Sequence, residues 1–256
     1  MLGAEYLEQL PEGLLELYEE YSVSIINDIA RRLAKTGRIT ATASWQMQRL
    51  TESGEVYKNA LKQLAKLSGK TVPELRRMFK EAGVKTLKFD DAIYKAAGLN
   101  PPPLNLSPAM LRVLGAGLAK TQGVMNNLTR TTALSAQQSY IRAADLAHMQ
   151  ITGGAMSYDQ AIRAAVKQVA SQGLSTIAYA SGHRDQLDVA LRRAILTGVQ
   201  QTAGALQLAR AQEMGCTLVQ VSAHSGARPT HVEFQGKVFA LNGFIPDSSF
   251  YTYTVR

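Results

Sequence analysis

Hydrophobic residues recur at three- and four-residue intervals over most of the chain, a spacing that predicts amphipathic helices. In residues 11–36 the repeating positions are Leu14, Leu17, Tyr18, Tyr21, Ile25, Ile29 and Leu33. Basic side chains fall in the last turns of this segment, and Gly37 follows as the expected stop. Further helices are predicted at 43–68, from Thr71 to Gly83, and near 89–97. The pattern therefore predicts a set of packed helices in the first hundred residues.

The clearest break in the pattern is the run Asn100-Pro101-Pro102-Pro103. Three consecutive prolines cannot continue a helix, and they hold the backbone extended. We therefore expect four parts in the chain. They are an N-terminal helical subdomain at 1–99, a Pro-rich linker at 100–106, a long-helix region at 107–215 and a β-rich region at 216–256.

The long-helix region is predicted to contain three helices, at about 107–152, 157–172 and 183–214. Ser107-Pro108 is typical of a helix start. Ser157 and Gln160 have the spacing of a capping box, and Gly215 is the expected C-terminal stop.

From Thr217 the pattern changes to a period of two, which is typical of strands. Strands are predicted at 217–222, 237–239 and 250–255. The expected fold class is mainly α with a small α+β C-terminal part, in which long helices are followed by a short β-rich region.

Composition narrows the function classes. Of the 256 residues, 46% are hydrophobic and only 19% are charged, so neutral polar groups make up much of the remainder. The single cysteine, Cys216, excludes an internal disulfide framework and a Cys-cluster zinc site, and it fits a protein made in a reducing cytoplasm. No apolar stretch reaches the length of a membrane span, and the first residues lack the features of a signal peptide, so no membrane insertion is expected.

The net charge of +8 is unevenly distributed. Residues 1–22 contain six glutamates and no Lys or Arg, whereas residues 101–256 contain 13 Lys and Arg against 7 Asp and Glu. One interpretation is a polyanion contact at one end and a basic partner at the other. The other is an ordinary basic protein with one acidic helix face.

The densest polar cluster lies at 222–237, after the first predicted strand. If the protein were an enzyme, such as a transferase or nuclease, the candidate catalytic residues would be His224, Arg228, His231 and Glu233. The alternative is structural, with the histidines bonded to loop backbone and Arg228 paired with a carboxylate or a carbonyl. No metalloprotease, hydrolase, P-loop or dinucleotide-binding motif is present, and we expect no metal and no cofactor.

Several segments match a known pattern when taken together. They are 157–162 (SYDQAI), 179–184 (YASGHR), 189–202 (VALRRAILTGVQQT), 221–231 (VSAHSGARPTH) and 235–237 (QGK). In this combination the chain resembles the phage minor capsid protein 2 family, which is similar in turn to the Mu F-like head morphogenesis proteins. The residues that carry the resemblance are Arg192, Arg193, Gly198, Gln201, His224, Gly226, Arg228, Pro229, His231, Gln235 and Gly236.

The resemblance implies a structural, non-enzymatic virion component of a tailed bacteriophage, made in the host cytoplasm and present in multiple copies. It implies a place at the portal vertex or in the head interior, and a part in DNA packaging or delivery. The expected partners are the portal protein, other capsid proteins and packaged double-stranded DNA, the last through the basic 101–256 part. The acidic segment 1–22 is then a candidate docking element. The family's β-rich region continues beyond position 256, so we expect either a shorter form or a partial chain. The alternatives are an enzyme using the His/Arg/His cluster and an internal DNA-binding head protein.

Overall fold

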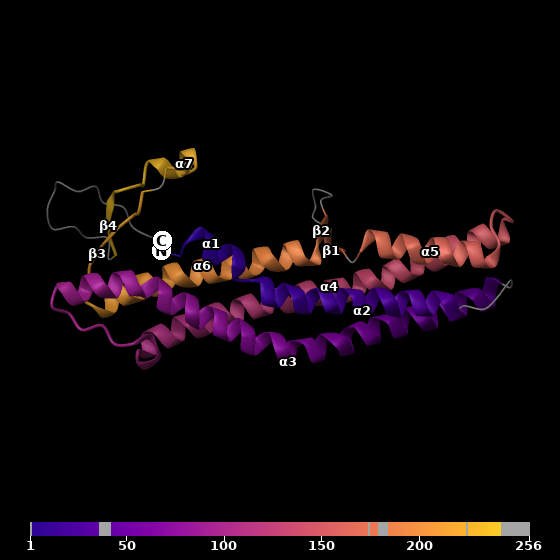
Figure 1. Ribbon diagram of the computed structural model, residues 1–256, viewed down its shortest axis with the longest axis horizontal. Helices are drawn as coiled ribbons and strands as arrows, with labels where there is room; N and C mark the ends of the chain where they lie inside the picture. The colour runs from indigo at the N-terminus through magenta and orange to yellow at the C-terminus, as the bar shows by residue number, and fades with distance from the viewer. Residues whose placement is uncertain (1, 36–41, 174, 179–183, 224, 242–256) are drawn as a thin grey trace. The chain divides into compact units, whose positions relative to one another are not determined.

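The computed structural model describes residues 2–35, 42–173, 175–178, 184–223 and 225–241 (Figure 1). Its elements, in chain order, are α1 (Ala4–Gln9), α2 (Glu12–Lys35), α3 (Thr42–Ala96), a 3-10 turn (Leu104–Leu106), α4 (Pro108–Thr152), α5 (Tyr158–Gln172), β1 (Ser175–Ala178), β2 (Arg184–Gln186), α6 (Leu187–Glu213), β3 (Leu218–Gln220), α7 (Pro229–Val232) and β4 (Val238–Ala240). The predicted fold class is confirmed: long helices are followed by a small antiparallel strand pair.

The chain forms two compact units. The first unit contains Gly3–Met78 and Leu118–Val199. The second unit contains Phe79–Gly117 and the described residues from Gln200 onward. Each unit therefore combines segments from both sides of the proline run. The division into subdomains around the linker 100–106 remains a prediction.

In the first unit, α2 packs against α5 and bonds to α3. The predicted apolar face of α2 is buried except for Leu17, which is partly buried: the buried residues are Leu14, Tyr18, Tyr21, Ile25, Ile29 and Leu33. The phenol of Tyr21 donates a hydrogen bond to the carbonyl oxygen of Ala60 over 3.3 Å. Helix α3 also contacts α4, because the ring of Trp45 stacks on that of His148 with centroids 4.5 Å apart.

In the second unit, an apolar cluster of Leu87, Leu104, Met110 and Leu206 joins the C-terminal part of α3 to α4 and α6. Strands β3 and β4 pair antiparallel, with Val219 opposite Phe239. Phe239 is buried and lies 6.4 Å from the ring of Phe234. The strands predicted near 217–222 and 237–239 are therefore present. The strand predicted at 250–255 lies outside the described residues.

Helix α3 corrects the prediction of three separate helices in 43–97, because it runs without a break from Thr42 to Ala96 and contains Pro73. The apolar spacing continues in phase across the proline, and Leu64, Leu67, Leu75 and Met78 are all buried. Burial of that face outweighs the roughly 3 kcal/mol that an internal proline costs a helix.

Gly83 was predicted to end a helix, but it lies inside α3 and is buried. A Cβ at this position would lie 2.9 Å from Cδ1 of Leu104 and 3.0 Å from Cδ1 of Leu206. Gly83 therefore serves close packing in the second unit, a role that the local sequence does not distinguish from a helix stop.

Other predicted helix ends are confirmed. Ser157 and Gln160 form the expected capping box at the start of α5, and Ser107 accepts a bond from the backbone N–H of Met110 at the start of α4. Gly98 follows α3 with a φ of 81°, a left-handed conformation that favours glycine.

The hairpin of β1 and β2 was not predicted, and helix α6 therefore begins at Leu187 rather than at 183. None of the helices in the described ranges has the length and apolar character needed to span a membrane.

Candidate functional site

The polar segment between β3 and β4 contains the residues predicted as an enzyme's candidates. Arg228 precedes α7 with an extended backbone, and its carbonyl oxygen accepts the N–H of His231 over 2.8 Å. Glu233 ends the same short helix. The side chains of all three residues are exposed, and no ion pair joins them to any residue that the structure describes. His224 lies outside the described residues, so its place in a catalytic cluster remains a prediction.

The backbone of the same segment forms hydrogen bonds that stabilise the strand pair. The N–H of Gly236 bonds to the carbonyl of Val221 over 2.9 Å, and the N–H of Val221 bonds to the carbonyl of Lys237 over 2.9 Å. Gln220 adds a side-chain bond to the carbonyl of Gly236 over 3.0 Å. Gly236 has a φ of 71°, which explains a glycine in this motif. The Gln235-Gly236-Lys237 motif thus extends the β3–β4 pairing.

On α6, the two neighbouring arginines of the motif point to different partners within the first unit. Arg192 donates to the backbone carbonyl of Glu8 in α1 over 3.0 Å. Arg193 forms an ion pair of 2.8 Å with Asp185, whose side chain is buried. The pair therefore ties α6 to α1 on one side and to the β1–β2 hairpin on the other.

Gly198, a third motif residue of α6, lies against Thr121 of α4. A Cβ on Gly198 would lie 2.0 Å from Oγ1 and 3.1 Å from Cβ of Thr121. In the second unit, Gly117 of α4 has the same relation to Thr202 of α6, at 2.0 Å from Oγ1. Both glycines are therefore required by close helix packing. Gln201, the remaining motif residue of α6, is exposed.

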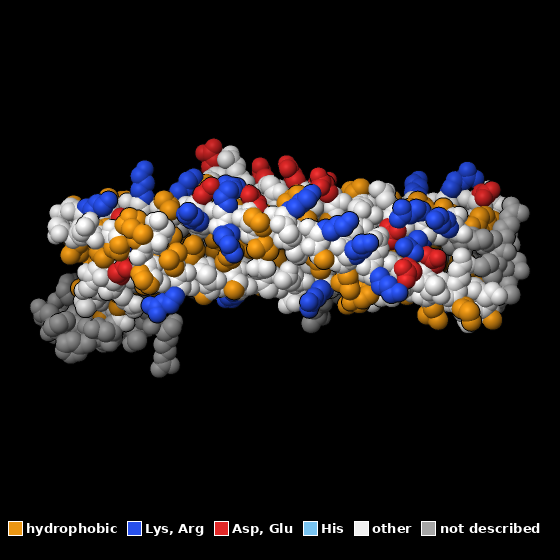
Figure 2. Space-filling model, turned by 90° about the horizontal axis from the view of Figure 1, so that it is seen from below, with side chains coloured by type: hydrophobic (Ala, Val, Ile, Leu, Met, Phe, Trp, Pro, Cys, Tyr) orange, Lys and Arg blue, Asp and Glu red, His pale blue; other side chains and the backbone are white. Residues whose placement is uncertain are grey.

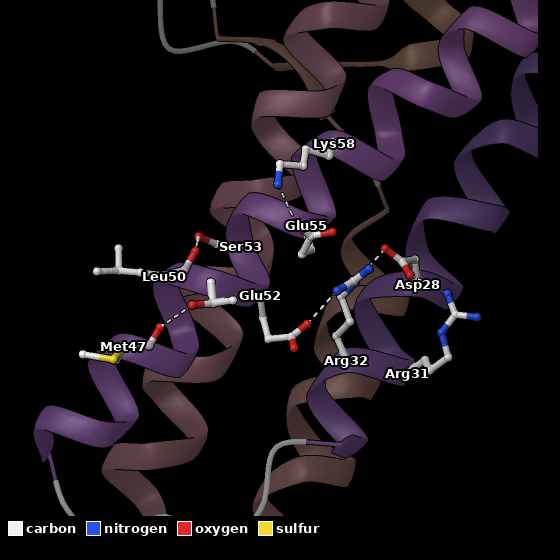
Figure 3. Close-up of polar contacts among 10 residues, drawn as sticks. Asp28, Arg31, Arg32, Met47, Leu50, Glu52, Ser53, Glu55 and Lys58 are labelled. Atoms are coloured by element: carbon white, nitrogen blue, oxygen red, sulfur yellow. Dashed lines mark hydrogen bonds and ion pairs between the residues drawn. The ribbon is translucent and has the colours of Figure 1, made fainter.

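A cluster of charges joins α2 and α3 in the first unit (Figure 3). Asp28 is buried and accepts bonds from Arg31 and from Nε of Arg32, the latter over 2.9 Å. Arg32 also reaches Glu52 over 2.6 Å. The guanidinium of Arg32 therefore bridges a carboxylate on each helix.

The pKa of Asp28 reflects these contacts. Burial acts to raise it, but hydrogen bonds from Arg31, Arg32 and Asn59 outweigh burial and leave the pKa of Asp28 below its usual 3.8. A lowered carboxyl pKa contributes stability that is present above the unfolded-state pKa. That contribution is lost as the pH falls through the folded-state pKa.

A second buried charge network lies in the second unit. Arg210 of α6 is fully buried and forms ion pairs with Asp91 of α3 at 3.1 Å and with Glu213 at 2.7 Å. Glu213 also accepts a bond of 2.5 Å from the hydroxyl of Ser107, at the start of α4. Burial raises the pKa of Asp91, against the opposite effect of the nearby Arg210. The network connects three helices, and removing one partner from such a buried set is costly.

A groove in the first unit is lined by apolar side chains and by charged ones that are mainly acidic, with Arg192 also among them. The groove lies between α2 and α6 and has a volume of about 510 Å³. Its lining includes Glu12, Glu16 and Glu19 from the acidic segment, and Asp188 from α6. Burial raises the pKa of Tyr18, which lies at the same groove, to about 12, against the smaller effect of a hydrogen bond with Thr71. The acidic segment predicted as a docking element therefore borders a surface depression.

None of these arrangements supplies an evident set of reacting groups. Across the part of the chain that the structure describes, no group of three His, Cys, Asp or Glu side chains is placed to hold a metal ion. Cys216 is partly buried next to Tyr94, and burial is the main cause that raises the pKa of that tyrosine. The described charges mainly tie helices together or border grooves.

The comparison with known families decides the identity. The family model described as phage minor capsid protein 2 matches residues 2–252, nearly the whole chain. The chain belongs to the phage minor capsid protein 2 family. Membership confirms the resemblance seen in the sequence and assigns the chain to the components of phage virions. No curated protein and no solved structure matches this minor capsid chain.

Some features of this phage minor capsid protein were not predicted from its sequence. Arg210 has no local signal of burial, because its partner Asp91 lies far away in the chain. The stacking of Trp45 on His148 was missed for the same reason, since His148 was interpreted as an ordinary helix residue. The acidic groove could have been suspected from the glutamates of 1–22, but its apolar lining combines Leu15, Tyr18 and Ile26 of α2 with Leu187 of α6.

Proposed function

We propose that this minor capsid protein is a non-catalytic component of a tailed-phage particle, located at the portal vertex or in the head interior, where it takes part in DNA packaging or delivery. The observation that carries the proposal is the family match over residues 2–252. Two further observations support it. The described charge clusters join helices, and the candidate catalytic side chains Arg228, His231 and Glu233 are exposed without mutual ion pairs.

The portal protein is the proposed partner of the acidic groove. Glu12, Glu16 and Glu19 are exposed and line it beside apolar side chains. Opposite charges at an interface rim speed association and orient the partners, while an apolar centre supplies most of the affinity. Packaged double-stranded DNA is the second proposed partner, supported by the excess of basic residues in 101–256. Multiple copies per particle and a Mu F-like role in head morphogenesis belong to the same proposal.

Location in purified particles tests the proposal. We expect labelled protein at one vertex or inside the head of intact virions, seen by cryo-electron microscopy and by mass spectrometry of the particles. Its absence from purified virions would contradict the proposal.

The portal contact is tested by charge substitution rather than by deleting 1–22, because that deletion would remove the buried Leu14, Tyr18 and Tyr21. We expect Glu12→Gln, Glu16→Gln and Glu19→Gln together to reduce co-purification with the portal protein. The matched control neutralises three acidic residues elsewhere on the surface, with Glu81→Gln, Asp159→Asn and Glu233→Gln. Equal binding by both triple variants would rule out the acidic groove as the docking site.

A further inference from the structure

Four lysines form a row on the exposed face of α3 within the first unit. They are Lys58, Lys62, Lys66 and Lys70, and each is exposed. Residues four apart lie on one face of a helix and are separated by about 6 Å along its axis. The lysine row, as we call these four residues, therefore extends over about 18 Å along the helix axis and turns around that axis by about 40° at each step. Figure 2 shows many Lys and Arg side chains on the side of the molecule that is viewed from below α3.

Three of the four lysines of the row have no acidic partner on their own helix. Residues 56–73 contain these four lysines and no Asp or Glu. The acidic residues that flank this stretch have basic partners of their own: Glu55 pairs with Lys58 over 2.8 Å, and Glu74 pairs with Arg77. For the other three lysines, no carboxylate of the described chain lies within ion-pair distance. Their positive charge is available to a ligand.

A groove runs beside the lysine row, between α2 and α3, and its lining combines polar side chains with Leu17, Tyr21 and Leu67. It has a volume of about 450 Å³ and is lined in part by Lys66, Lys70, Asn59 and Gln63. Arg31, which is paired with Asp28, also lines the groove, and Glu20 is the carboxylate among its lining residues. Ammonium, amide and guanidinium groups are donors that contact phosphate oxygens.

The described part of α3 that bears the lysine row has no large exposed hydrophobic side chain. Along α3, large exposed hydrophobic side chains stop at Leu50 and resume at Val84. The centres of protein–protein interfaces are depleted in charge and rich in aromatic residues, whereas interfaces with DNA are polar and strongly positive. The stretch between these two residues matches the second description.

We propose that the lysine row and its neighbouring groove bind the phosphate backbone of double-stranded DNA without sequence preference. The inference deepens the proposed function, because packaged DNA is the polyanion of a phage head. It places the main contact on α3, outside the 101–256 part that carries most of the basic excess. Duplex DNA presents one charge per about 1.7 Å of axis, so an 18 Å row of cations faces several phosphates at once.

The test compares two triple variants of the full chain that lose the same charge. The first is Lys62→Gln, Lys66→Gln and Lys70→Gln. The control is Arg112→Gln, Arg130→Gln and Lys167→Gln, three exposed basic residues of the 101–256 part. Binding of two short DNA duplexes of unrelated sequence is measured by fluorescence anisotropy over a range of salt concentrations. Circular dichroism checks that every variant keeps its helix content.

For the lysine-row variant we expect affinity at about 0.1 M salt to fall at least tenfold for both duplexes. The slope of log K against log salt should decrease by about 2.7, because three phosphate contacts are lost. Lys62→Arg, Lys66→Arg and Lys70→Arg together should retain binding. The control variant should keep a slope close to that of the unaltered protein.

Equal losses in the two triple variants would overturn the proposal, since they would show a general effect of net charge. Retained DNA binding in the lysine-row variant would also overturn it. If that variant instead lost self-association in sedimentation, or if binding to poly-glutamate alone depended on the three lysines, the row would be a surface for an acidic protein. DNA binding in solution does not depend on where the protein lies in the particle, so failure here is distinguishable from failure of the proposed function.

Discussion

Gly198 and Thr121 show how the residue required at one position can depend on a neighbour that is distant in the sequence. The sequence singled out Gly198 through the family motif and offered no physical reason for a glycine inside a helix. In the structure the reason is Thr121, whose hydroxyl occupies the place of a missing Cβ. Thr121 is itself buried, and its Cβ lies 3.1 Å from that place, so rotation of the threonine relieves only part of the overlap. Such constraints are set by tertiary contact and cannot be deduced from local pattern.

Gly198→Ala is therefore expected to lower the free energy of unfolding by about 1–3 kcal/mol, the usual cost of overpacking a close contact. Gly204 in the same helix provides the control, because no atom lies within 4 Å of a Cβ built there. Gly204→Ala is expected to increase stability by about 0.5–1 kcal/mol through its better helix propensity. Urea denaturation followed by circular dichroism gives both values. A gain in stability for both variants would show that α4 and α6 are farther apart than described.

At the scale of elements, helix α3 separates what local signals can predict from what they cannot. The apolar face was predicted, and the end of α3 at Gly98 was predicted as well. The breaks near Thr71 and Gly83 were wrong, because a capping pattern and a glycine outweighed an apolar periodicity that continues through both. The β1–β2 hairpin was missed because β2 consists of Arg, Asp and Gln and shows no alternation of apolar and polar residues. Short strands depend on pairing and leave little periodic signal.

Continuity of α3 leads to a prediction about Pro73. This residue is exposed inside the helix, where it removes one backbone donor and crowds the preceding turn. Pro73→Ala is expected to increase the free energy of unfolding by about 1–3 kcal/mol. Gly69→Ala, four residues earlier and with open space for a Cβ, is the reference for an ordinary gain in helix propensity. A gain from Pro73→Ala no larger than that of Gly69→Ala in urea denaturation would indicate a helix break at Pro73.

At the scale of the whole chain, the compact units divide the residues in another way than the proline run suggests. Sequence alone indicates a junction between one part that ends at 99 and another that begins at 107. The compact units, however, each combine residues from before and after that junction. In the first unit, Arg49 reaches Asp145 over 2.6 Å, and Trp45 stacks on His148. Contacts between residues about 100 positions apart are invisible to a reading of composition and periodicity.

These contacts predict the behaviour of a chain cut at the junction. A protease site inserted between Leu99 and Asn100, both exposed, allows cleavage after folding. We expect the two fragments to elute together in size-exclusion chromatography, and the emission of Trp45, the single tryptophan, to stay unchanged until urea is added. Replacing both Asp145 and His148 with Ala should lower the urea concentration at which the fragments separate. The two substitutions remove the ion pair with Arg49 and the stacking with Trp45, which join the fragments. Fragments that separate in plain buffer, each retaining its helix content, would instead support independent subdomains on either side of 100–106. The uncut protein carrying the same insertion shows whether the added residues alone disturb the fold.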